Sequence, residues 1–285
     1  MRIRFFISDK KREKTLARSF ATGAERLGDK VEIVDRCAEP DCSAVDAVAM
    51  VGVKAKKIYD AAMQAGAIPI MFDKGYTRHR RNGSGVWEYW RISIGDHHPT
   101  KMMGKLIKGG RCPANRFDSL HQYVRPWRER GKYIILAGSS AKYHDFYGLP
   151  HPTGWAENVV AQIREISDLQ IHYRPKPSWR EAEEIEGTIY SDAKDKLGVL
   201  LNEAHCVVTH GSNISWEAAL YGVPSIVLGS GVGALLGGVR IDQIGAPPMI
   251  DRDPWFHCLA HFQWTENEMA SGRMWKFFRG TGKLV

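Results

Sequence analysis

Short apolar runs alternate with amphipathic segments along the first half of the chain. The runs predict strands and the segments predict helices: strands at 3–7, 31–34, 45–53, 68–72 and 91–94, and helices at 14–27 and 55–65. Strands that alternate with helices are typical of a parallel sheet. We therefore expect an α/β domain, with any ligand beyond the C-terminal ends of its strands.

The second half repeats this alternation and is organised around residues 204–231, AHCVVTHGSNISWEAALYGVPSIVLGSG. The run at Cys206–Val208 is apolar and rich in β-branched residues, which favours a strand buried on both faces. Small and polar residues then interrupt it, and Ser212 or Asn213 can cap the helix that follows. Gly222 and Pro224 end that helix, so this stretch is predicted to be a strand, turn, helix and strand.

Residues 255–278 close the chain and are predicted to form two helices, the second opened by a capping box of Thr265 and Glu268. We place an N-terminal acceptor-binding α/β domain at 1–127 and a C-terminal donor-binding α/β domain at 128–254. The helices of 255–285 are long enough to cross back to the first domain. At 285 residues with 44% hydrophobic content, the chain has enough residues for two such cores.

The turn at 209–213 is the first candidate binding site, and its predicted ligand is a phosphate. Exposed amides at a helix N-terminus hold partial positive charge and suit a phosphate. Glu217 follows the turn by about one helical turn, where a carboxylate can accept hydrogen bonds from ribose hydroxyls. A second glycine-rich loop, at 229–233, follows the next strand and can close over the same ligand.

The motifs THGSN and SWEAALYGVPSIVLG resemble the donor-nucleotide signature of GT-B glycosyltransferases. The resemblance implies an α/β fold with two Rossmann-like domains that face a cleft, and it extends to capsule-type sugar transferases and sugar-nucleotide epimerases. It implies a nucleotide-sugar donor and no other cofactor. The donor-binding residues that we predict are Gly138, Ser139, Arg174, Lys176, His210, Gly211, Ser212, Asn213, Glu217 and Ser230.

The charge of the chain is unevenly distributed. Residues 1–127 contain 24 Lys and Arg against 14 Asp and Glu, a balance of +10, whereas 128–285 have a balance of −2. A basic domain favours a polyanionic acceptor. Basic and aromatic side chains after the strand at 68–72 suit nucleic acid or sugar rings. The acceptor-binding residues that we predict are Lys74, Tyr76, Arg78, Arg80, Arg81, Trp87 and Trp90.

Three residues that follow predicted strands are candidates for the base that takes the acceptor hydroxyl proton: Asp73, Asp96 and His97. The sequence contains one DxD triplet, Asp251-Arg252-Asp253, which lies apart from the predicted donor-binding residues, and we predict a metal-independent reaction. The five cysteines are odd in number and scattered, which indicates neither a disulfide framework nor a zinc site. No apolar run approaches about 18 residues, so we expect no membrane span and a cytoplasmic protein.

Three functions remain at this point. A glycosyltransferase accounts for both the donor turn and the basic first half. An epimerase of the same fold needs no basic acceptor face, and a non-catalytic nucleic-acid-binding protein needs no Glu217 with its turn. We therefore predict a glycosyltransferase. Its acceptor is either a hydroxymethylated base in DNA, which the compact basic loop at 78–85 favours, or an anionic polysaccharide or lipid-linked glycan.

Overall fold

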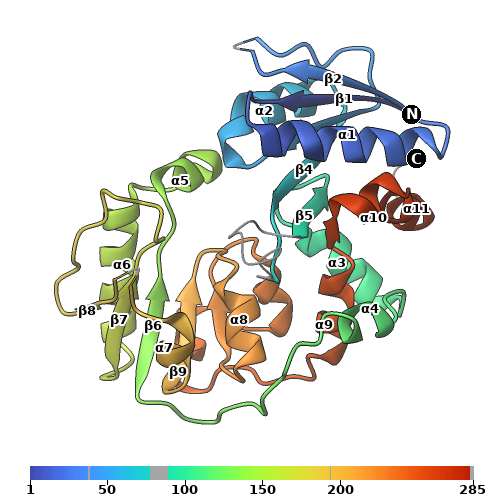
Figure 1. The fold of residues 1–285 in the computed structure, drawn as a ribbon. Coiled ribbons are helices and arrows are strands. Elements are labelled where there is room, and N and C mark those ends of the chain that lie inside the picture. The colour runs from blue at the N-terminus through green and yellow to red at the C-terminus, as the bar shows by residue number, and fades with distance from the viewer. Residues whose placement is uncertain (38, 78–88, 193, 283–285) are drawn as a thin grey trace. The chain divides into compact units, whose positions relative to one another are not determined.

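The computed structural model describes residues 1–37, 39–77, 89–192 and 194–282, and it divides into two compact units (Figure 1). Unit 1 comprises Met1–Met102 and Cys258–Val285, and unit 2 comprises Met103–His257. The sequence placed these divisions at 127/128 and 254/255. Residues 103–127 belong with unit 2 because Phe117 stacks on Phe256 at 4.9 Å between ring centroids.

Unit 1 is built on a six-stranded sheet with the order β11-β5-β4-β3-β1-β2. Its elements are β1 (Arg2–Ile7), α1 (Lys11–Glu25), β2 (Lys30–Asp35), β3 (Ala47–Val51), α2 (Lys56–Gln64), β4 (Ile68–Lys74), β5 (Tyr89–Ile94), the start of α3 (Thr100–Lys108), the end of α9 (Asp253–Ala260), β11 (Gln263–Thr265), α10 (Glu266–Ala270) and α11 (Arg273–Gly280). The predicted capping box of Thr265 and Glu268 at the start of α10 is confirmed.

Two strands of this sheet correct the prediction of a wholly parallel sheet. β5 runs antiparallel to β4, and β11 runs antiparallel to β5. In the β4–β5 pair, Ile70 lies opposite Ile94 and Lys74 lies opposite Trp90, as in an antiparallel ladder. β11 lies where a helix was expected, because the residues around Gln263 alternate between the two faces of the sheet and pair with the free edge of β5.

The core of unit 1 is an aromatic cluster between the sheet and α1. Phe5 stacks on Phe72 at 5.2 Å, and the Phe20 ring meets both edge-on. Trp275 of α11 packs against Phe20 and donates a hydrogen bond to Asp29 at 2.5 Å. The C-terminal segment is therefore part of the core of this unit, and removing one of these rings would cost roughly 3–5 kcal/mol.

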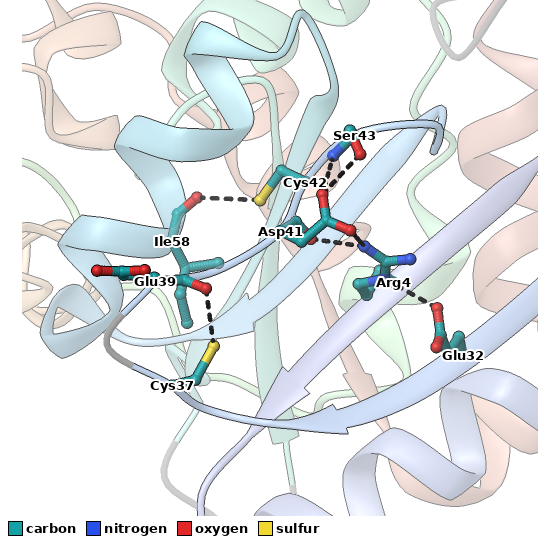
Figure 2. A network of polar contacts seen from close by, with 8 residues as sticks. All are labelled: Arg4, Glu32, Cys37, Glu39, Asp41, Cys42, Ser43 and Ile58. Carbon is teal, nitrogen blue, oxygen red and sulfur yellow. Dashed lines mark hydrogen bonds and ion pairs between the residues drawn. The ribbon is translucent and has the colours of Figure 1, made fainter.

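Arg4 stabilises the segment that follows β2 (Figure 2). Its guanidinium donates hydrogen bonds to the carbonyl and the carboxylate of Asp41 and to the carboxylate of Glu32. Hydrogen bonds from Ser43, followed by the bond from Arg4, lower the pKa of Asp41 to about 2. Cys37 and Cys42 lie in this segment as free thiols.

Unit 2 is a five-stranded parallel sheet with the order β10-β9-β6-β7-β8. Its elements are the remainder of α3, α4 (Asn115–Asp118), β6 (Tyr133–Ala137), α5 (Ala141–Tyr147), α6 (Pro152–Arg164), β7 (Gln170–Arg174), β8 (Ile189–Tyr190), α7 (Leu197–Leu201), β9 (Ala204–Thr209), α8 (Ile214–Leu220), β10 (Ser225–Val227) and the start of α9. Helices cover both faces: α6 packs on Ile134 and Leu136, while α7 and α8 pack on Ile135.

No helix in the described part of the chain combines the length and the apolar character that a bilayer span needs.

Candidate functional site

Unit 2 has a topological switch point between β6 and β9. The chain leaves β6 toward β7 on one side, and it leaves β9 toward β10 on the other. Ligands of parallel sheets bind beyond the C-terminal strand ends at such a point. The two loops that meet here are 138–140 after β6 and 210–213 after β9, and both were predicted to bind the donor.

These two loops are joined by direct contacts. Thr209 donates a side-chain hydrogen bond to the carbonyl of Ala137 at 3.0 Å. The Tyr143 hydroxyl, on the helix that follows β6, lies 3.1 Å from Nδ1 of His210. Parallel pairing of β6 and β9 brings their ends together, so segments about 70 residues apart in sequence form one surface.

The glycine-rich loop after β10 closes against the same histidine. A Cβ on Gly229 would lie 2.3 Å from the His210 ring, so only glycine permits this approach. Ser230 donates a hydrogen bond to the Tyr147 hydroxyl at 3.2 Å, and the Tyr147 ring lies 5.4 Å from that of His210. We call Tyr143, Tyr147, His210 and Ser230 the switch-point cluster.

His210 is neutral at physiological pH in this environment. Burial, followed by the proximity of His144, lowers the pKa of His210 to about 4. A neutral imidazole offers one donor and one acceptor to a ligand. His210 therefore suits hydrogen bonding to a sugar or phosphate oxygen and does not supply a positive charge.

The remaining turn residues lie where the sequence placed them. Gly211 is buried, and Ser212 and Asn213 are half-buried just before α8. The Ser212 hydroxyl accepts a hydrogen bond from the Ile214 amide, whereas Asn213 occupies the cap position without a side-chain cap bond. Glu217 is half-buried in the first turn of α8.

The Arg174 side chain donates hydrogen bonds to a loop of unit 2, residues 191–195. Its guanidinium, 8% exposed, donates hydrogen bonds to the Ser191 hydroxyl and to the carbonyls of Asp192 and Asp195. It therefore orders 191–195 beside the end of β7. Lys176 is exposed, Ser139 is buried, and Gly138 donates its amide hydrogen bond to the carbonyl of Arg174.

Unit 1 brings together two of the three candidate bases. Nη2 of Arg91 lies 2.9 Å from Nε2 of His97 and 3.4 Å from Oδ2 of Asp73. Nε2 of His97 and Oδ2 of Asp73 are 3.9 Å apart. Asp96 instead forms an ion pair with Lys101 at 3.1 Å. The structure therefore groups Asp73 with His97 and leaves Asp96 at a separate position.

Arg91 also contacts a second histidine. Its Nη1 lies 3.2 Å from Nδ1 of His98, and the rings of His97 and His98 meet edge-on at 4.4 Å between centroids. Arg91 therefore contacts Asp73 and both imidazoles.

Asp73 is the accessible member of the group. Its side chain is 38% exposed, whereas those of Arg91 and His97 are 3% exposed. Burial by itself would raise the pKa of the Asp73 carboxyl, but the interactions with His97 and Arg91 outweigh it and hold that pKa well below its usual range. Asp73 is therefore ionised and able to accept a hydrogen bond from a hydroxyl.

The predicted acceptor residues have different positions. Lys74 is exposed, but Tyr76 and Trp90 are 2% and 3% exposed, too deep to contact an acceptor in this structure. The Arg12 guanidinium covers the Trp90 ring at 3.9 Å, and Glu266 accepts the indole hydrogen bond. The other predicted acceptor residues lie outside the described residues: Arg78, Arg80, Arg81 and Trp87.

Within the residues that the structure describes, no group of three or more His, Cys, Asp and Glu could hold a metal ion.

Sequence reasoning missed Arg91, Tyr143 and Tyr147. Arg91 lies inside a predicted strand, where charged residues are usually solvated. The two tyrosines stand one helical turn apart on α5, directly after the small-residue turn at 138–140, and that spacing was the available signal.

The fold of both units is that of GT-B proteins, with two Rossmann-like α/β units. Two solved structures, both of KpsC from Thermosulfurimonas dismutans, are similar over nearly the whole chain. One is a β-Kdo 2,4-transferase, with 12% identity, a TM-score of 0.59, and coverage of 92% of this chain and 91% of that one. The other is a β-Kdo 2,7-transferase, with 12% identity, a TM-score of 0.61, and coverage of 99% and 100%.

A putative UDP-N-acetylglucosamine 2-epimerase from Listeria monocytogenes aligns with 12% identity over 100% of this chain and 97% of that one, with a low TM-score of 0.32. Neither a protein-family model nor the sequence of a curated protein matches the chain.

Proposed function

We propose that this protein is a glycosyltransferase that transfers a sugar from a nucleotide-activated donor to a hydroxyl of an anionic glycan. Unit 2 binds the donor, and unit 1 binds the acceptor. The observation that carries the proposal is the switch-point cluster, where three loops of unit 2 converge on His210.

The donor assignment follows from the chemistry of that cluster. Backbone amides of the small-residue turn at 210–213 suit a phosphate, and Glu217 suits the ribose hydroxyls. The Tyr147 ring and the neutral His210 imidazole offer flat faces and hydrogen-bonding atoms for a sugar or base. These groups are the ones that an activated sugar requires.

The charge of unit 1 supports an anionic acceptor. Unit 1 as the structure defines it has 23 Lys and Arg against 15 Asp and Glu, a balance of +8, whereas unit 2 is neutral with 17 of each. The whole net charge of the chain therefore lies on the unit that does not contain the switch-point cluster. A basic surface concentrates a polyanion before any specific contact forms.

Two acceptors are compatible with a basic unit 1: an anionic glycan and DNA with a hydroxymethylated base. The sequence favoured a hydroxymethylated base in DNA, and the basic loop that motivated this prediction lies outside the described residues. The two KpsC structures with the same fold are Kdo transferases, which favours a glycan over DNA as the acceptor. We therefore place the glycan first and treat DNA as an outcome of the test.

Asp73 is proposed to take the proton of the acceptor hydroxyl. As the hydroxyl oxygen bonds to the anomeric carbon, the bond from that carbon to the donor phosphate breaks, and the nucleotide leaves with its phosphate. Asp73 is ionised and partly exposed, so it can accept the hydrogen bond and then the proton. Arg91 and His97 hold it in place from the buried side.

A nucleotide panel tests the proposal. We expect calorimetry and thermal shift to find at least one nucleoside monophosphate or diphosphate that binds, and a sugar activated by that nucleotide to be transferred to an anionic oligosaccharide. Binding without transfer to any glycan, but with transfer to hydroxymethylated DNA, would establish the DNA acceptor. Conversion of the sugar nucleotide without an acceptor would indicate an epimerase, and no binding to any nucleotide would refute the donor site.

A further inference from the structure

Gln263 forms three hydrogen bonds with the turn that follows β4. Its Oε1 accepts hydrogen bonds from the amides of Tyr76 at 2.9 Å and Thr77 at 2.8 Å. Its Nε2 donates to the Thr77 hydroxyl at 2.7 Å. The side chain is fully buried, so these bonds form without competition from water.

Gln263 is also in register with Asp73 and Arg91 across the sheet. Asp73 of β4 is paired with Arg91 of β5, and Arg91 is paired with Gln263 of β11. Residues directly opposite one another in a sheet project from the same face. Asp73, Arg91 and Gln263 therefore form one row across three strands.

The turn that Gln263 holds begins two residues after Asp73. Gly75 continues the ladder by donating its amide hydrogen bond to Tyr89, and a Cβ on Gly75 would lie 2.6 Å from the Tyr89 Cβ. The ring of Tyr76 then turns beneath Arg91, whose guanidinium carbon is 6.0 Å from the ring centroid. Movement of this turn would therefore reach both Asp73, through the backbone, and Arg91, through the Tyr76 ring.

We propose that Gln263 is a positioning residue for Asp73: its amide fixes residues 75–77, and through them it fixes the Asp73 carboxylate against Arg91. This inference rests on the proposed role of Asp73 as the base. A residue near the C-terminus thereby supports a group formed by Asp73, Arg91 and His97. The strand β11 supplies both the outer edge of the sheet and the acceptor for two buried amides.

Three variants separate this role from general stability. Gln263→Ala removes all three bonds. Gln263→Glu keeps both amide bonds, because a carboxylate accepts hydrogen bonds, and it adds a negative charge beside Arg91. The control is Gln243→Ala in unit 2, since Gln243 makes the same pattern of bonds, accepting from the amides of Val239 and Arg240 and donating to the carbonyl of Gly237.

The first readout is amide hydrogen exchange, which requires no substrate. We expect Gln263→Ala to accelerate exchange at Tyr76 and Thr77, Gln263→Glu to restore protection, and Gln243→Ala to leave these two amides unchanged. Unchanged exchange at both amides in Gln263→Ala would overturn the proposal. If Gln263→Ala fails to fold, Thr77→Val replaces it, because it removes only the bond to the Thr77 hydroxyl.

The second readout is the kinetics of sugar transfer. Gln263→Ala should lower kcat about tenfold to a hundredfold through misplacement of Asp73, with the donor KM unchanged because the donor binds unit 2. Gln263→Glu should recover most of kcat but move the acidic limb of the pH profile upward, since a second carboxylate near Arg91 disfavours ionised Asp73. Equal effects on kcat from Gln263→Ala and Gln243→Ala would refute a positioning role.

The two readouts distinguish failure of the proposed function from failure of the positioning role of Gln263. If the wild-type protein transfers no sugar to any acceptor, the proposed function fails, while the exchange data still show whether Gln263 fixes the turn. If transfer occurs and Gln263→Ala changes exchange but not kcat, the proposed function stands and the positioning role is wrong.

Discussion

The guanidinium of Arg91 lies 3.4 Å from the carboxylate of Asp73, and only the carboxylate reaches solvent. A buried cation thus stabilises an accessible anion from behind. Replacement of the cation would leave the carboxylate in place but free to change its protonation and its direction. A substrate would meet Asp73 and not Arg91.

Asp73→Asn should therefore abolish most of the catalysis and leave the fold intact. Asparagine is nearly isosteric but cannot take a proton, and loss of a general base typically lowers the rate by about 10² to 10⁴. The measurement is steady-state transfer, with circular dichroism to verify folding.

Asp96→Asn is the matched control for this substitution. Asp96 pairs with Lys101 on α3, so we expect near-normal turnover. If Asp96→Asn is the slower variant and Asp73→Asn is active, the base has been assigned to the wrong carboxylate.

Glu217→Ala should weaken nucleotide binding without unfolding unit 2. Loss of hydrogen bonds between a charged group and the ribose should cost on the order of 2 to 3 kcal/mol. Calorimetry with the tightest nucleotide of the panel measures the change. Glu157→Ala, at an exposed position on α6, is the control, and equal affinities for both variants would remove Glu217 from the donor site.

His210 should titrate with a midpoint near pH 4, well below its ordinary value of 6.5, because burial and His144 oppose its charged form. Between these two values the unfolded state binds more protons than the folded state, so stability should fall as the pH falls through that window. NMR titration of the imidazole, assigned by loss of the signal in His210→Asn, measures the midpoint. A midpoint at 6.5 or above would show that His210 is solvated and does not belong to a closed cluster.

Binding of the acceptor should weaken as the salt concentration rises. Unit 1 carries the net charge of +8, and screening reduces attraction between a basic surface and a polyanion. Fluorescence anisotropy with an anionic oligosaccharide and with duplex DNA compares the two acceptors, and DNA would show a log–log slope of about −0.9 per phosphate contact.

Replacement of Arg80 and Arg81 by Ala tests the sequence-based prediction for the basic loop. If the loop contacts DNA phosphates, the slope should decrease by roughly one to two units, with nucleotide affinity unchanged. Lys194→Ala with Lys196→Ala, two exposed positions in unit 2, is the control. Absence of DNA binding at low salt would leave the glycan as the acceptor.

The sequence by itself determined the strands other than β11, several of the helices and the central unit of 204–231. These elements depend on local patterns: β9 is buried along its whole length and has an apolar centre at Cys206–Val208, and the small and polar residues at 209–213 follow this centre where the chain must turn. The α/β class and the GT-B resemblance followed from the same stretch.

Only the tertiary structure decided which side chains meet. Tyr143 and His210 are brought together by pairing of β6 with β9, and Gln263 reaches Tyr76 because β11 pairs with β5. Strand pairing between distant segments depends on which edge is free and which face is buried, and neither is encoded by local periodicity. For the same reason Trp90, which the sequence offered as a ligand-stacking residue, is covered by Arg12, while Arg91, its neighbour on the opposite face of β5, holds Asp73.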